Sequence, residues 1–106
     1  MDYQILSHYL KAISNPIRLE ILNILSCGEL CANDLLTHFQ VTQPTLSHHM
    51  KALVDNHLVT KRQDGNKHYY RLNTQTYTLL LDQLHDIGTS QADCVCHTIH
   101  KGVEPQ

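Results

Sequence analysis

The stretch that decides the fold is residues 42–72, which reads TQPTLSHHMKALVDNHLVTKRQDGNKHYYRL. In its first part, apolar side chains recur at the spacing i, i+4, i+7, i+8, and this spacing predicts a helix with one buried face. The apolar residues are Leu46, Met50, Leu53 and Val54. Thr42 is a suitable N-cap for that helix, and Pro44 falls in its first turn. The opposite face is polar and basic, and it carries Gln43, Thr45, Ser47, His48 and Lys51.

The second part of this stretch predicts a β-hairpin. Residues 58–62 and 67–72 are β-prone, and the turn between them is built on Asp64-Gly65. Because a lone hairpin is marginal in water, we expect it to pack on the helices. Its expected anchors are Val59 and either Tyr69 or Tyr70. Its cations, which can reach phosphates or a minor groove, are Lys61, Arg62, Lys67 and Arg71.

The segments on both sides of this stretch are predicted to be helical, because apolar residues repeat there at helical spacing. These helices are expected over residues 3–13, 16–26, 30–39 and 74–87. Asn15 can cap the second of them, with Pro16 at the first helical position. An ordinary pair of surface helices explains the periodicity equally well. The basic hairpin that follows directly favours a winged helix-turn-helix, which is a mostly α fold with a small β-hairpin: five helices plus the wing.

The length, composition and charge of the chain agree with this architecture. With 106 residues it has room for one compact domain. We expect residues 1–88 to form the winged helix-turn-helix and dimerisation domain, and 89–106 to form a Cys/His-containing tail. No stretch reaches the ~18 apolar residues of a membrane span and no leader precedes the first helix, so we expect a cytoplasmic protein with no membrane partner.

The formal net charge of −2 is spread unevenly along the chain. Residues 41–72 hold five basic and two acidic residues, whereas the remainder holds three basic and eight acidic residues. A basic face on an acidic body suits a protein that presents one face to a polyanion.

Taken together, these elements and their residues resemble the ArsR/SmtB family of metal-sensing repressors. The resemblance covers about residues 3–87, and its sharpest part is the run Ser-His-His-x-Lys-x-Leu over residues 47–53. The other segments that carry it are NPIRLEIL (15–22), GELCANDL (28–35) and HYYRL (68–72). The resemblance implies a homodimer that binds an operator of imperfect dyad symmetry and releases this DNA when a metal binds.

For such a repressor, the polar face of the helix that begins near residue 43 would enter the major groove. Gln43, Thr45, Ser47 and His48 would face base edges, because amides and hydroxyls can read their donors and acceptors. Lys51, Lys61, Arg62, Lys67 and Arg71 would neutralise phosphates. A twofold dimer would place two such helices in successive major grooves, ~34–36 Å apart. The apolar stripe of the last helix is either the dimer seam or a cap on the core of the monomer.

The four cysteines indicate metal binding, redox chemistry or simple burial, because a cytosolic chain rarely keeps structural disulfides. Cys94 and Cys96 form a Cys-x-Cys pair that can chelate one thiophilic ion. Thiol sensors of the family carry Glu-Leu-Cys-x-Cys-Asp-Leu where this chain has Cys31 followed by Asn33 in place of the second cysteine. We therefore expect Cys31, Cys94 and Cys96, from one chain or both, to form the site. Burial of Cys31 between helices is nearly as good an explanation of that residue.

Three thiolates suit As(III) or Sb(III) as the inducer, and addition of His97 would suit Cd(II), Pb(II) or Zn(II) instead. His97 and His100 form a second possible metal pair, and we interpret Cys27 as packing or as a reserve ligand. The family's other common site uses Asp and His on the terminal helix. Residues 73–76 read NTQT and lack the Asp-x-His that this site requires.

Two other functions stay open from the sequence. One is a thiol redox sensor of the same fold, in which Cys94 or Cys96 oxidises. The other is a small zinc-binding interaction module with no role on DNA. We do not expect an enzyme or an organic cofactor, because the thiols lie in a tail or a helix with no evident oxyanion hole.

Overall fold

The computed structural model describes residues 2–89 of the chain. Within them lie five helices and a small three-stranded antiparallel sheet. The elements are α1 (Tyr3–Ile13), α2 (Pro16–Leu25), β1 (Leu30–Cys31), α3 (Ala32–Phe39), α4 (Gln43–Asp55), β2 (Val59–Asp64), β3 (Lys67–Leu72) and α5 (Thr74–Ile87). This arrangement confirms the predicted mostly α winged helix-turn-helix. No helix of the described part is long and apolar enough to span a bilayer.

The helices begin where the sequence supplies a side chain that accepts from the free backbone N–H groups of the first turn. Asp2 accepts from the N–H of Ile5 at 2.8 Å at the start of α1. Asn15 accepts from the N–H groups of Ile17 and Arg18 at 2.9 and 3.2 Å, which confirms its role as the N-cap of α2. These caps are local, so they could be predicted from the sequence.

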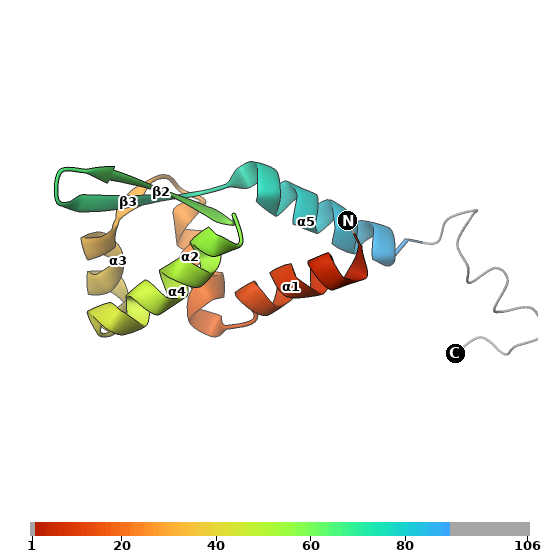
Figure 1. The fold of residues 1–106 in the computed structure, drawn as a ribbon, viewed down its shortest axis with the longest axis horizontal. Helices are drawn as coiled ribbons and strands as arrows, with labels where there is room; N and C mark the ends of the chain where they lie inside the picture. The colour runs from red at the N-terminus through yellow and green to blue at the C-terminus, as the bar shows by residue number, and fades with distance from the viewer. Residues whose placement is uncertain (1, 90–106) are drawn as a thin grey trace, which may run out of the picture.

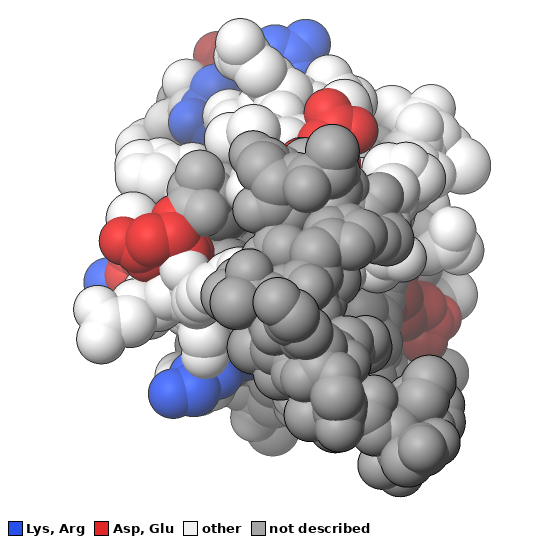
Figure 2. Space-filling view, turned by 90° about the vertical axis from the view of Figure 1, so that its right-hand side faces the viewer, with Lys and Arg blue, Asp and Glu red and all other residues white. Residues whose placement is uncertain are grey.

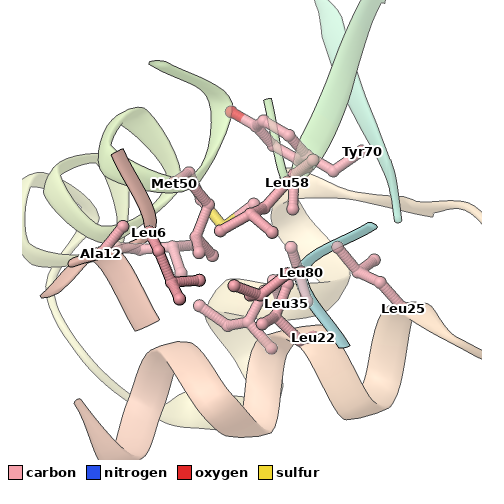
Figure 3. Packing of buried hydrophobic residues seen from close by; sticks show 13 residues of the cluster. Leu6, Ala12, Leu22, Leu25, Leu35, Met50, Leu58, Tyr70 and Leu80 are labelled. Atoms are coloured by element: carbon pink, nitrogen blue, oxygen red, sulfur yellow. The ribbon is translucent and has the colours of Figure 1, made fainter. Parts of the chain in front are cut away.

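A single apolar core joins the helices to the hairpin (Figure 3). The predicted inner face of α4 is confirmed, because Leu46, Met50 and Leu53 are all buried. Val59 and Tyr70 are also buried and anchor the hairpin on the helices as expected. Burial of each large apolar side chain stabilises the fold by about 1.5–3 kcal/mol relative to exposure.

The sheet contains a strand that the sequence did not predict. We expected a helix from residue 30, but Leu30 and Cys31 pair with Tyr70 and Tyr69 of β3 and only then does α3 begin. The strand order is β1-β3-β2, so the wing strand β3 lies in the middle. A two-residue strand leaves no periodicity in the sequence, and its partner lies about forty residues away along the chain.

The hairpin turn is also displaced by one residue from its predicted centre. Asp64 pairs with Lys67, so the two loop residues are Gly65 and Asn66. Gly65 has a φ of 62°, and no positive φ occurs at Asn66. A positive φ at the first loop position alone is what a type II′ hairpin requires, and glycine supplies it.

The elements separate into two ends of the molecule (Figure 1). The helices α3 and α4 lie with the wing at one end, whereas α1 and α5 lie side by side at the other. Gln40, with a left-handed φ of 53°, ends α3 and lets the chain turn into α4 within three residues. The helix pair that precedes the wing therefore has the short turn of a helix-turn-helix.

Candidate nucleic-acid interface

The outer face of α4 is open to solvent. All five side chains predicted on that face are exposed, and they are Gln43, Thr45, Ser47, His48 and Lys51. Four of them lie in the first half of the helix, which is the half that reads base edges in helix-turn-helix proteins. The inner face is held by the core, so the orientation of the outer face is fixed by packing.

The cap of α4 also orients one of these polar side chains. The Thr42 hydroxyl accepts from the N–H of Thr45 at 3.3 Å and donates to the Thr45 hydroxyl at 2.8 Å. With the Thr45 oxygen accepting this bond, its own hydroxyl hydrogen is free to point outwards. Thr45 can then donate to an acceptor on a base or a phosphate.

His49 lies behind the outer face and was missed in the sequence analysis. It is the buried histidine of α4, and its Nδ1 accepts from Nε of Arg18 on α2 at 3.0 Å. The same guanidinium donates to the carbonyl of Ala12 on α1 at 3.2 Å. Burial lowers the pKa of His49, and the charges of Arg18 and His48 lower it further. This contact ties α4 to α1 and α2, and the lowered pKa favours the neutral imidazole that accepts the bond.

The cations of the wing differ in what they contact. Lys61, Lys67 and Arg71 are exposed and make no ion pair with any residue in 2–89. Arg62 instead forms two charge-assisted hydrogen bonds to the carboxylate of Glu29. On α4, Lys51 is exposed and pairs with Asp55 one turn later at 2.9 Å. Lys61 and Lys67 thus line the cleft beside the outer face of α4, whereas Arg71 lies in a separate hollow with Cys27 and Gly28 at the end of α2.

A cleft of about 560 Å³ lies between α3, α4 and the wing. Residues from all three elements line it, among them Cys31, Gln43, Ser47, Lys61, Lys67 and His68. Cys31 therefore shares a cleft with Gln43 and Ser47 of the outer face of α4. Nδ1 of His68 is buried without a hydrogen-bond partner among the described residues.

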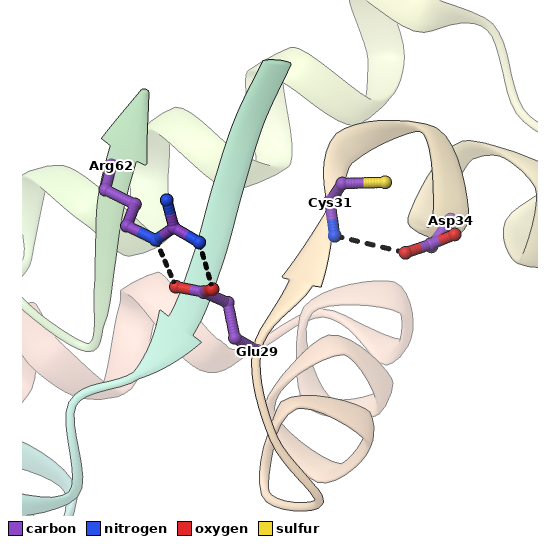
Figure 4. A network of polar contacts seen from close by, with 4 residues as sticks. All are labelled: Glu29, Cys31, Asp34 and Arg62. Carbon is purple, nitrogen blue, oxygen red and sulfur yellow. Dashed lines mark hydrogen bonds and ion pairs between the residues drawn. The ribbon is translucent and has the colours of Figure 1, made fainter. Parts of the chain in front are cut away.

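Of the three predicted thiol ligands, the structure places only Cys31. It is half-buried at the N-cap of α3, where its N–H donates to the Asp34 carboxylate at 3.2 Å (Figure 4). Hydrogen bonds from the thiol and the N–H of Cys31 hold the pKa of Asp34 below its usual value. Cys27 is exposed after the end of α2. The other predicted ligands, Cys94, Cys96, His97 and His100, lie outside the described residues.

Within residues 2–89, no group of three or more His, Cys, Asp or Glu side chains is placed to hold a metal ion. Of the predicted metal ligands, only Cys31 lies in the described part of the chain.

Known proteins are similar to this chain in sequence and in fold. The family described as "Bacterial regulatory protein, arsR family" matches residues 15–61. The arsenical resistance operon repressor of Staphylococcus aureus is 58% identical over 102 residues, which cover 96% of this chain and 98% of that protein. The chain belongs to the ArsR family. The protein of the same name from Staphylococcus xylosus is 57% identical over the same shares of the two chains.

Solved structures of ArsR-type regulators have the same fold. An ArsR-like transcriptional regulator from Rhodococcus sp. RHA1 matches with a TM-score of 0.76 at 26% identity, over 98% of this chain and 97% of that one. A possible transcriptional regulator for arsenical resistance matches with a TM-score of 0.69 at 31% identity, over 79% of this chain and 88% of that one. These relatives confirm the predictions that this ArsR-family chain is a transcriptional repressor and is not an enzyme.

Proposed function

We propose that this ArsR-family chain represses an arsenical resistance operon as a homodimer and leaves its operator when a thiophilic metalloid binds. The observation that carries the proposal is the exposed polar face of α4 beside the unpaired wing cations Lys61 and Lys67, in a chain 58% identical to an arsenical resistance operon repressor. As(III) or Sb(III) is the inducer that we favour, with Cd(II), Pb(II) or Zn(II) as alternatives.

The DNA contacts divide by chemistry between α4 and the wing. Gln43, Thr45, Ser47 and His48 are exposed on the first half of α4 and can exchange hydrogen bonds with base edges. Lys61, Lys67 and Arg71 carry free charges that suit phosphates, as does Lys51 once it leaves Asp55. The first group would select the operator sequence, whereas the second would supply affinity that falls with salt.

The homodimer that the proposal requires has a suitable surface at the α1/α5 end. Seven large apolar side chains are exposed in the described part of the chain, and six of them lie on α1 and α5. Seen from that end, most of the described surface belongs to uncharged residues (Figure 2). An apolar surface of this kind is typical of a protein interface. A twofold contact here would leave α4 and the wing of each protomer free for DNA.

The inducer site would use Cys31 with Cys94 and Cys96, from one protomer or both. Three thiolates are the donor set that As(III) and Sb(III) suit, and one further nitrogen from His97 would suit a tetrahedral divalent ion. Cys31 lies at the start of α3 and in the cleft beside α4, so an ion bound there would act on the helix pair that carries the DNA face. A typical coupling of about 1–3 kcal/mol would weaken DNA binding roughly 5–150-fold.

A titration of the DNA complex tests both halves of the proposal. Fluorescence anisotropy of a labelled fragment of the protein's own promoter, against an unrelated duplex at moderate salt, measures selective binding. The complex is then titrated with As(III), Sb(III), Cd(II), Zn(II) and peroxide. We expect As(III) and Sb(III) to release the DNA, whereas release by peroxide alone would indicate the redox sensor.

The variants Cys31→Ser, Cys94→Ser and Cys96→Ser are expected to bind DNA and to lose the As(III) response. Cys27→Ser is the matched control, because Cys27 is exposed outside the proposed site, and it should respond as the parent does. A parent protein that shows no preference for its promoter would contradict the DNA-binding proposal. Serine variants that release DNA as the parent does would contradict the thiolate site.

A further inference from the structure

A bidentate ion pair links the wing to the segment before β1. Nε and Nη2 of Arg62 donate to the two carboxylate oxygens of Glu29 at 2.9 and 2.7 Å. These residues are 33 positions apart in the chain. The fork of a guanidinium matches a carboxylate in this geometry, and such bidentate pairs are more specific than a single contact.

The Arg62 side chain crosses the middle strand of the sheet to reach this partner (Figure 4). Arg62 pairs with Tyr69 of β3 in the ladder, and its guanidinium carbon lies 4.2 Å from the centre of the Tyr69 ring. Tyr69 pairs in turn with Cys31 of β1. The contact therefore spans all three strands, from β2 over β3 to the residue that precedes β1.

These contacts leave Arg62 poorly suited to be a phosphate ligand. Two of its five N–H donors are used by Glu29, and the Tyr69 ring covers one face of the guanidinium. A phosphate approaching Arg62 would also meet the Glu29 carboxylate, whose pKa is lowered by Arg62 and Arg71 so that it stays ionised. Arg62 thus differs from Lys61, Lys67 and Arg71, which are unpaired among the described residues.

We propose that Glu29 and Arg62 are positioning residues that fix the angle of the wing for DNA, and that Arg62 is not one of the phosphate ligands. The Glu29–Arg62–Tyr69 contact, named here the wing clamp, holds β2 and β3 against the segment before β1. This inference rests on the proposed DNA-binding function. It differs from the sequence-based expectation that all four wing cations neutralise phosphates.

The test compares operator affinity and its salt dependence for the parent, Glu29→Gln, Arg62→Gln, the double variant and Lys67→Gln. We expect Glu29→Gln and Arg62→Gln each to weaken operator binding by about threefold to tenfold, and the double variant to be no weaker than either. The slope of log affinity against log salt should stay at the parent value in all three. Lys67→Gln is the control for a phosphate contact, and its slope should fall by about one.

The alternative is that Arg62 leaves Glu29 and binds a phosphate when DNA is present. In that case Glu29→Gln would tighten binding or leave it unchanged, and Arg62→Gln would lower the salt slope as Lys67→Gln does. Either result would overturn the proposal.

Hydrogen exchange of the free protein separates this inference from the DNA-binding function. Loss of the wing clamp should speed amide exchange in β1, β2 and β3 while helices α1 and α5 keep the parent rate. Unchanged exchange in the three strands would overturn the wing clamp. A parent protein without operator preference, but with faster strand exchange in Glu29→Gln, would contradict only the proposed function.

Discussion

Neighbouring side chains of α4 point in opposite directions, some to solvent and some into the core. Gln43 and Ser47 are exposed and belong to the proposed DNA-contacting set, whereas Leu46 and Met50 are buried in the core. The direction of each side chain follows from the helical period, so the exposed set could be predicted from the sequence. Their separate roles on DNA can be tested one residue at a time.

The first prediction at this scale separates base readout from phosphate contact. Gln43→Ala removes an amide that can bond a base edge, and it should weaken operator binding by about 1–3 kcal/mol while affinity for unrelated DNA stays nearly the same. The measurement is anisotropy on operator and unrelated duplexes across a salt series. Lys67→Gln is the counterpart, which should weaken binding to both duplexes alike. Equal losses on both duplexes for Gln43→Ala would remove it from the base-reading set.

The second prediction concerns the pH dependence of folding through His49. Because burial and Arg18 lower the pKa of His49 in the folded chain, the unfolded chain takes up this proton at a higher pH. The contribution of neutral His49 to the free energy of unfolding is therefore complete above the ordinary histidine pKa of 6.5. It is lost progressively as the pH falls below that value. Protonated His49 could no longer accept from Nε of Arg18.

His49→Asn tests this effect, because the amide oxygen can accept the same bond and does not titrate. The free energy of unfolding in urea, measured at about pH 7.5 and about pH 5.5, should fall less with acid in the variant than in the parent. His49→Ala serves as the control for loss of the acceptor and should cost about 1–3 kcal/mol at the higher pH. An equal acid sensitivity in the parent and His49→Asn would exclude His49 as the group responsible.

At the scale of elements, the wing depends on a turn that only glycine makes cheaply. Gly65 has a φ of 62°, and a Cβ built there would meet no atom within 4 Å. Gly65→Ala should therefore destabilise the protein through backbone strain alone, by about 1–2 kcal/mol. In a domain of this size, that is a fall in Tm of very roughly 4–16 °C by calorimetry or circular dichroism.

Gly88→Ala is the matched control, because Gly88 has helical φ and its added Cβ would make only ordinary contacts, the nearest at 3.7 Å. It should leave Tm unchanged or raise it slightly. If the two alanine variants melt at the same temperature, the strained turn is not what Gly65 provides.

The elements also show how far the sequence predicts the fold and the site. Helical periods, the Asn15 cap and the β-prone runs are local signals, so all five helices and the wing could be predicted. Strand β1 could not, because Leu30 and Cys31 become a strand only by pairing with β3. Glu29 and His49 were missed for the same physical reason, since their partners lie 33 and 31 residues away. The exposed face of α4 followed from spacing, whereas which wing cation is paired depended on tertiary contacts.

At the scale of the whole molecule, the basic polar surface and most of the exposed apolar residues lie at opposite ends. The basic segment, residues 41–72, contains α4 and the wing, whereas α1 and α5 carry most of the exposed apolar residues. Because α4 and the wing lie at the other end of the chain from α1 and α5 (Figure 1), two copies that met at the α1/α5 end would leave the proposed DNA face of each uncovered. We therefore expect a variant of the proposed DNA face to lose DNA binding and still dimerise. A variant that cannot dimerise should also bind DNA more weakly.

The prediction at this scale is that Leu81→Glu converts the protein to a monomer. Leu81 on α5 is 46% exposed in the single chain, so the folded protomer tolerates a carboxylate there, but a dimer contact would have to bury its charge. Sedimentation at micromolar concentration should show the monomer mass. Operator affinity should fall by about 100-fold or more, because two half-sites are no longer bound by one linked pair.

Leu19→Glu is the control. Leu19 lies on α2, outside α1 and α5, and is 51% exposed, so this variant should sediment and bind as the parent does. If Leu81→Glu sediments with the same mass as the parent dimer, the dimer does not form through the part of α5 around Leu81. The proposed arrangement of the two DNA faces would then be wrong.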